Sequence, residues 1–187
     1  EFRDNIDVVA DIGERLGVRG FNALYGNRVD GVDPATQDEL AAESIGLAAK
    51  AVASFGGTVL IEPVSGPKPY PLRTAADAVS VVRQARAAGA ANVGFLCDLY
   101  HLASNGDDID AAIAGYAEYV AHVQIADAPG RGEPGSGQLD LDRYVADLAR
   151  RGYRGWVSLE YKPTGTTEAS LAWLPREWRG GRTEEKS

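Results

Sequence analysis

The feature that most constrains the fold is a regular alternation of two kinds of segment. Five short apolar runs are separated by longer segments whose apolar residues recur at helical spacing. The apolar runs are VRGFNALYG (18–26), TVLIEP (58–63), NVGFLCD (92–98), AHVQIAD (121–127) and WVSLEYK (156–162). Strands that alternate with helices predict βαβ units, and nearly continuous apolar strands indicate a parallel sheet that is covered on both faces.

The segments between the strands carry helix signals. Asp33 before Pro34, and later Thr74, are residue types that begin a helix, and Gly17, Gly89 and other glycines follow the expected ends. Helices are expected over residues 4–16, 34–55, 75–88, 109–120, 140–151 and 170–178. The sequence therefore predicts one domain over 1–178 and a polar C-terminal tail over 179–187.

Two α/β architectures fit this order of elements, a doubly wound sheet and a (β/α)8 barrel. Neither a GxGxxG turn nor a Walker loop is present, so a nucleotide-binding open sheet has little support. We therefore predict a (β/α)8 TIM barrel that is represented here by about five βα units.

Composition narrows the classes of function. The formal net charge is −8 and basic residues are scattered, which disfavours a surface that tracks nucleic-acid phosphates. No apolar run approaches the roughly 18 residues of a membrane span, and the first residues lack the layout of a signal peptide. The single cysteine, Cys97, excludes an internal disulfide and is expected in the core. We expect a cytoplasmic protein that binds neither nucleic acid nor membrane.

Four strands end in a residue that offers an oxygen atom: Glu62, Asp98, Gln124 and Glu160. In a parallel barrel these carboxyl ends converge on one mouth, where active sites are built. At such short distances the three carboxylates repel one another. A divalent cation relieves the repulsion and also binds the amide oxygen. All four donors are hard oxygens, so the pattern predicts Mg²⁺ or Mn²⁺ as the cofactor.

Two histidines and an arginine lie near these strand ends. His101 follows Asp98 by three residues at the start of a loop, from which its ring could reach the mouth. His122 points the same way as Gln124 but one layer deeper, so packing or hydrogen bonding is expected for it. Arg131 lies in a glycine-rich loop and suits a carboxylate or a hydroxyl-rich substrate.

The segments IEPVSG, CDLYH, HVQIADAPGRGEPGSG and LEYKPTGTTEASLAWL resemble the hydroxypyruvate isomerase family, within the xylose-isomerase-like TIM barrels. The resemblance implies a divalent metal held by Glu62, Asp98, Gln124 and Glu160. It also implies that Glu62 and Glu160 act as proton donor and acceptor, and that His101 and Arg131 touch the substrate.

The resemblance implies an intramolecular oxidoreductase that interconverts hydroxypyruvate and 2-hydroxy-3-oxopropanoate (tartronate semialdehyde) through an enediolate. Its partner is a small hydroxy-carbonyl substrate, and a homo-oligomer is compatible with the sequence. A complete barrel of this type has about 250 residues and eight strands. By this resemblance the five strands here are strands four to eight, so three N-terminal βα units are expected to be absent from this sequence, which also contains no methionine.

Two other functions stay open. A ketose 3-epimerase or another sugar isomerase would use the same metal site, although the epimerases tend to carry His where this chain has Gln124. A non-catalytic barrel fragment that binds metal or sugar is the alternative outside catalysis. The DNA-repair branch of the superfamily needs many histidines for its zinc cluster. This chain has two, which disfavours that branch.

Overall fold

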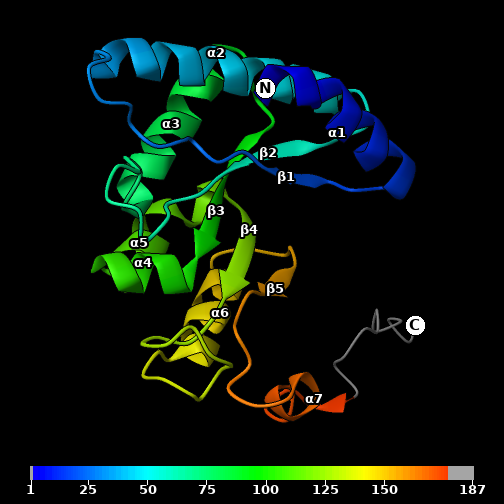
Figure 1. Cartoon of the computed structure of the whole chain (residues 1–187). Helices are drawn as coiled ribbons and strands as arrows, with labels where there is room; N and C mark the ends of the chain where they lie inside the picture. The colour runs from blue at the N-terminus through cyan, green and yellow to red at the C-terminus, as the bar shows by residue number, and fades with distance from the viewer. Residues whose placement is uncertain (1, 177–187) are drawn as a thin grey trace.

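The computed structural model describes residues 2–176 and contains one parallel sheet (Figure 1). Its strands are β1 (Gly20–Asn22), β2 (Thr58–Ile61), β3 (Val93–Asp98), β4 (Val120–Ile125) and β5 (Val157–Leu159). They pair in the order of the chain, each parallel to the next. Every strand is shorter than the apolar run that predicted it. The runs of β1, β2, β4 and β5 continue into loops at the carboxyl end of the sheet, whereas β3 keeps the last residue of its run, Asp98, and loses only the first.

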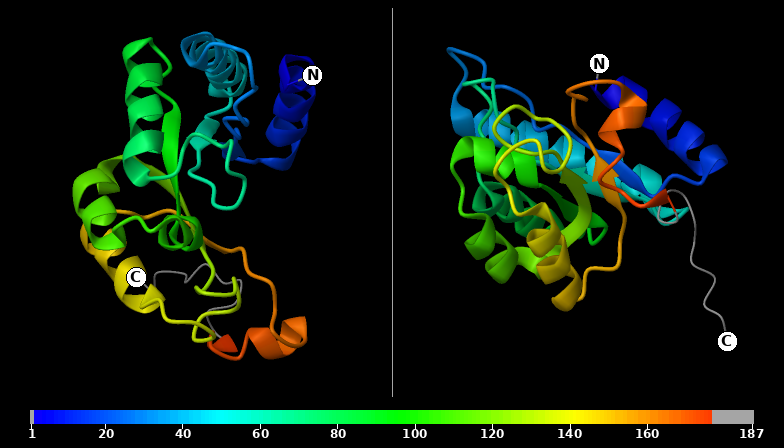
Figure 2. Two further views of the ribbon diagram at one scale, coloured as in Figure 1. Left: turned by 60° about the vertical axis from the view of Figure 1, so that its left-hand side comes forward. Right: turned by 90° about the horizontal axis from the view of Figure 1, so that it is seen from below.

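Helices precede, separate and follow the strands. They are α1 (Phe2–Leu16), α2 (Pro34–Ala53), α3 (Ala75–Ala87), α4 (Leu99–Asn105), α5 (Ile109–Tyr116), the 3-10 helix η1 (Ala117–Tyr119), α6 (Leu141–Arg150) and α7 (Thr167–Ser170). Figure 2 shows α1, α2, α3, α5 and α6 following one another in an arc around the strands. Among the residues that the structure describes, no helix is both long enough and apolar enough to cross a membrane.

Several helices begin where the capping residues predicted. Asp33 caps α2 by accepting the Thr36 main-chain N–H, and Pro34 occupies the first turn. Thr74 and Asp77 form a reciprocal capping box at the start of α3. Each of these side chains satisfies a main-chain N–H that has no partner inside its helix, which explains why such short signals fix the boundaries.

Other boundaries differ from the prediction. The first helix begins at Phe2 and not at residue 4. The predicted helix over 109–120 ends at Tyr116, and Val120 belongs to β4 after a 3-10 turn. The last helix spans Thr167–Ser170, so it ends where the predicted one begins; Trp178 and the predicted boundary at residues 178 and 179 lie outside the described residues.

The helix α4 was not predicted, and it corrects the placement of His101 on a loop. Asp98 ends β3 and also caps α4, because its carboxyl group accepts the main-chain N–H of His101 at 3.0 Å. Gly106 ends the helix in the left-handed conformation, with φ of 77°. A helix of seven residues has too few turns to show a periodic apolar pattern, which is why the sequence concealed it.

Alternation along the strands assigns one set of residues to the helices and another to the inner side of the sheet. The buried side chains that face the helices include Val59, Ile61, Phe95, Cys97, Val123 and Ile125. The intervening residues point to the inner side. Ala121 is an extra residue in β4, because Phe95 pairs with Val120 but Leu96 pairs with His122. This irregularity puts His122 and Gln124 on the same inner side as Asp98.

The sheet is open at both edges. Within the described residues β1 pairs only with β2, and β5 pairs only with β4. Apolar side chains are exposed near these edges, including Leu16 at the end of α1 and Trp156 before β5, each 75% exposed. The structure is therefore a curled half-barrel of five parallel strands with helices outside, and the predicted fold class is confirmed.

Candidate active site

The polar residues at the strand ends lie on the inner side of the half-barrel. Glu62 follows β2, Asp98 ends β3, Gln124 lies in β4 and Glu160 follows β5. Asp98 and Gln124 are paired neighbours in the sheet. The main-chain N–H of Glu160 donates to the carbonyl of Ile125 at 3.0 Å, which continues the pairing of β4 with β5 beyond the strand.

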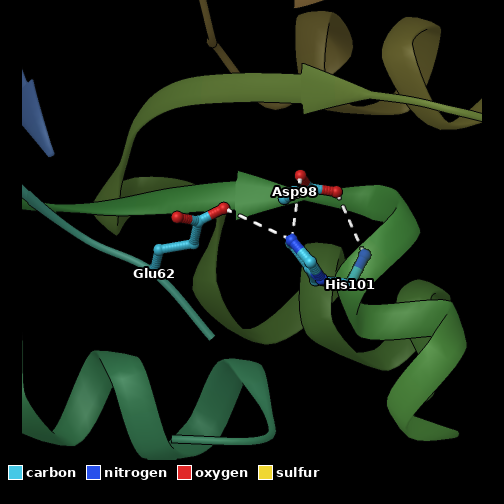
Figure 3. Close-up of side chains that lie close together, drawn as sticks. All are labelled: Glu62, Asp98 and His101. Carbon is cyan, nitrogen blue, oxygen red and sulfur yellow. Dashed lines mark hydrogen bonds and ion pairs between the residues drawn. The ribbon is translucent and has the colours of Figure 1, made fainter. Parts of the chain in front are cut away.

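Glu62, Asp98 and His101 form a compact, buried group. Their side-chain ligand atoms lie within 4.8 Å of one another, and each residue is at most 5% exposed. Nε2 of His101 is 4.0 Å from Oε1 of Glu62 and 3.9 Å from Oδ2 of Asp98. Figure 3 shows the imidazole ring directed toward both carboxyl groups.

The electrostatics of this group disfavour bare charges. Burial raises the pKa of Asp98 to about 7, and the carboxylates of Glu62 and Glu160 add to the rise. Burial also raises the pKa of Glu62, against the lowering effect of a hydrogen bond from Asn22. Burial lowers the pKa of His101 to about 4, with the charge of Arg131 acting in the same direction. A cation placed here would favour the ionised carboxylates.

Gln124 adds an independent sign that the site is built for a ligand. Its Oε1 atom is buried and accepts no hydrogen bond within the described part of the chain. An orphaned buried amide oxygen costs free energy unless something binds it. Carboxylate and amide oxygens are ligands that hard divalent cations prefer, so the residues present fit a metal site.

Glu160 stands apart from the compact group. Its Oε1 accepts a hydrogen bond from Nη2 of Arg131 at 2.7 Å, and its side chain is 43% exposed. Arg131 also lies over the ring of Tyr100 at 5.0 Å from the centroid and adopts the left-handed conformation, with φ of 61°. The structure thus pairs two residues that the sequence assigned to different tasks.

Asn22 and Tyr70 hold Glu62 in place, and the sequence reasoning missed both. Nδ2 of Asn22 donates to Oε2 of Glu62 at 2.6 Å. The hydroxyl group of Tyr70 donates to the Glu62 carbonyl at 2.9 Å and accepts the main-chain N–H of Tyr25. Asn22 had a recognisable signal, since it is a polar residue inside an apolar run on the inner side of the sheet. Tyr70 had none, because its contacts are to the main chain.

His122 makes a hydrogen bond away from the carboxyl groups. Its Nε2 is 2.9 Å from Oγ of Ser158 on β5. His122 pairs with Leu96 and is two residues before Gln124 in β4, on the same inner side of the sheet, so it lies one layer farther from the carboxyl end, as the alternation predicted. Cys97 is buried in the core, also as predicted.

The loop after β4 is joined to the loop after β5. Oε1 and Oε2 of Glu133 accept from the hydroxyl and main-chain N–H groups of Thr164 at 2.5 and 2.9 Å. The main-chain N–H of Lys162 donates to the carbonyl of Arg131 at 2.7 Å. These bonds fix the loop that carries Arg131 against the segment that carries Glu160.

Comparisons with known proteins show what this chain is similar to. A curated relative from Streptomyces coelicolor, named "Putative hydroxypyruvate isomerase", is 51% identical over 97% of this chain and 66% of its own length. Hydroxypyruvate isomerase from Escherichia coli is 30% identical over 93% of this chain and 67% of its own length. A crystal structure titled AP endonuclease, family 2, from Brucella melitensis has a TM-score of 0.85 and is 34% identical, over 92% of this chain and 66% of that one.

The chain spans about two thirds of the length of these three proteins. The family model described as a xylose isomerase-like TIM barrel matches residues 1–177. The half-barrel agrees with this match, and the chain belongs to the xylose isomerase-like TIM barrel family.

Proposed function

We propose that this chain carries the catalytic site of an isomerase that interconverts hydroxypyruvate and 2-hydroxy-3-oxopropanoate. The observation that carries the proposal is the buried group of Glu62, Asp98 and His101 beside the orphaned amide oxygen of Gln124. The names of the two curated relatives support the substrate. We also propose that the cofactor is Mg²⁺ or Mn²⁺ and that the protein is cytoplasmic.

The proposed metal ligands are Glu62, Asp98, Gln124 and Glu160. A bound divalent cation supplies a Lewis acid that stabilises negative charge on the oxygens of the substrate. Glu160 keeps a second carboxylate oxygen beside the one that Arg131 occupies, so the ion pair leaves it one atom for this role.

The proposed catalytic residues are Glu62 and Glu160. In the forward direction one glutamate removes a proton from carbon 3 of hydroxypyruvate, and the other delivers a proton to carbon 2. The hydroxyl proton leaves the oxygen on carbon 3, and a proton is added to the oxygen on carbon 2, so the atoms balance. His101 and Arg131 orient the substrate, with the guanidinium group of Arg131 suited to its carboxylate.

Solvent isotope incorporation tests this reaction. With hydroxypyruvate in D₂O and Mn²⁺ present, we expect one deuterium on carbon 2 of the product, because two different glutamates exchange protons with solvent. Mass spectrometry of the trapped aldehyde measures it. Turnover without any deuterium would indicate a hydride shift and contradict the proposed proton transfer.

Metal binding gives a second expected result. Mg²⁺ or Mn²⁺ should raise the unfolding temperature, since a ligand at 100 times its Kd adds about 2.7 kcal/mol to the free energy of unfolding. Asp98→Asn, which removes a buried ligand, should lose most of this shift in a thermal melt. Glu118→Gln is the matched control, because Glu118 is exposed and lies just before the amino end of β4, whereas the site is at the carboxyl end; this variant should keep the metal-induced shift. Equal shifts in wild type and Asp98→Asn would contradict the ligand set.

The two alternatives are separated by the same measurements. Faster turnover of ketoses than of hydroxypyruvate would favour an epimerase or another sugar isomerase on this site. A clear metal-induced shift without turnover of any of these substrates would favour a non-catalytic binding domain.

A further inference from the structure

We propose that the main-chain N–H of Ser65 fixes the neutral His101 imidazole as its Nε2–H tautomer, so that His101 presents a hydrogen-bond donor to the carboxyl groups. His101 would then not be a metal ligand, although its ring lies close enough to be one. The consequence for the metal rests on the proposed function, whereas the tautomer does not.

The contact that carries the inference is on the far side of the ring. The Ser65 main-chain nitrogen lies 3.0 Å from Nδ1 of His101, and the Ser65 hydroxyl oxygen lies 2.7 Å from the same atom. A main-chain N–H can only donate, so Nδ1 must present its lone pair. A neutral imidazole carries one N–H, which leaves the proton on Nε2. The hydroxyl group can rotate to either role and decides nothing.

The ring has little freedom to turn away from this arrangement. His101 lies in the first turn of α4, where its main-chain N–H donates to Oδ1 of Asp98 at 3.0 Å. The ring of Tyr100 packs edge-on against it, with centroids 5.4 Å apart. The residue is 5% exposed. The loop after β2, which carries Ser65, thus determines the tautomer of a ring that belongs to the first turn of α4.

The tautomer decides what the site can coordinate. A protonated Nε2 has no lone pair for a cation, although it lies 4.0 Å from Oε1 of Glu62 and 3.9 Å from Oδ2 of Asp98. With Oε1 of Gln124, the donor set is then made of oxygen atoms. Such a set favours Mg²⁺ or Mn²⁺, whereas zinc prefers sites that include imidazole or thiolate.

Nitrogen NMR of the histidine rings tests the proposal directly. The chain has two histidines, so ¹⁵N-histidine labelling gives two ring systems, and His122→Asn assigns them. The long-range ¹H–¹⁵N pattern of His101 should be that of the Nε2–H tautomer at neutral pH. It should stay so when Mg²⁺ is added, and also with Zn²⁺, which is the harder test. An Nδ1–H pattern, a doubly protonated ring, or loss of the Nε2 proton on metal addition would overturn the proposal.

Two variants separate the main-chain group from the hydroxyl group. Ser65→Ala keeps the N–H and should keep the Nε2–H pattern, whereas Ser65→Pro removes the N–H and should give a mixture of tautomers. If Ser65→Ala alone changed the pattern, the hydroxyl group would be the determinant and the proposal would be wrong; this holds even if Ser65→Pro does not fold. An inactive chain with the expected pattern would refute the proposed isomerase and support this inference.

Discussion

Replacing Glu160 by glutamine should lower kcat for hydroxypyruvate by about 10² to 10⁴, the usual contribution of a positioned acid or base. Glutamine keeps the size of the side chain, and its amide oxygen can still accept from Arg131, as Oε1 of Glu160 does at 2.7 Å. It can no longer exchange a proton at neutral pH. Because the side chain is 43% exposed, the fold should survive the change.

The experiment must separate lost chemistry from lost metal. Steady-state rates are therefore measured at saturating Mn²⁺, with the Mn²⁺-induced rise in unfolding temperature recorded for the same variant. Glu118→Gln makes the same change at an exposed position before the amino end of β4 and should keep wild-type rates. A Glu160→Gln enzyme within a few fold of wild type would remove Glu160 from the proposed mechanism.

The sequence predicted the parts of the fold that have strong local causes. The parallel strands follow from apolar runs, and α2 and α3 begin where Asp33 and Thr74 satisfy main-chain donors. The helix α4 was not predicted, because Asp98 was interpreted only as a strand end and is also a helix cap. Val120 was assigned to a helix because its spacing suits one, but a 3-10 turn intervenes.

The site was predictable to the extent that strand alternation and parallel order bring side chains together. Those two rules placed Glu62 and Asp98 in one buried group. The hydrogen bonds that orient the group come from residues distant in sequence, such as Ser65, which is 36 residues from His101. No local pattern encodes a contact between a main-chain N–H and a ring nitrogen, so such contacts appear only with the fold.

The largest expected loss of stability concerns Asp127, which sequence reasoning did not single out. The residue is 1% exposed, and its carboxyl group accepts four main-chain N–H groups. Oδ1 accepts from Ala128 at 2.8 Å and Leu139 at 2.9 Å, and Oδ2 accepts from Gly135 at 2.9 Å and Gly137 at 2.8 Å. One side chain therefore holds the loop that positions Arg131.

Asp127→Ala should lower the free energy of unfolding by roughly 3 to 5 kcal/mol. Each buried main-chain N–H left without a partner costs about 1–3 kcal/mol, and water can reach only some of the four N–H groups. Asp127→Asn should cost less, since its remaining oxygen still accepts two bonds. Urea unfolding measures both, with the exposed Asp142→Asn as control. Gly137→Ala should resemble Asp127→Ala, because a Cβ there would lie 2.5 Å from Oδ1 of Asp127. An Asp127→Ala protein within about 1 kcal/mol of wild type would show that these donors find water instead, and that the loop does not depend on the carboxyl group.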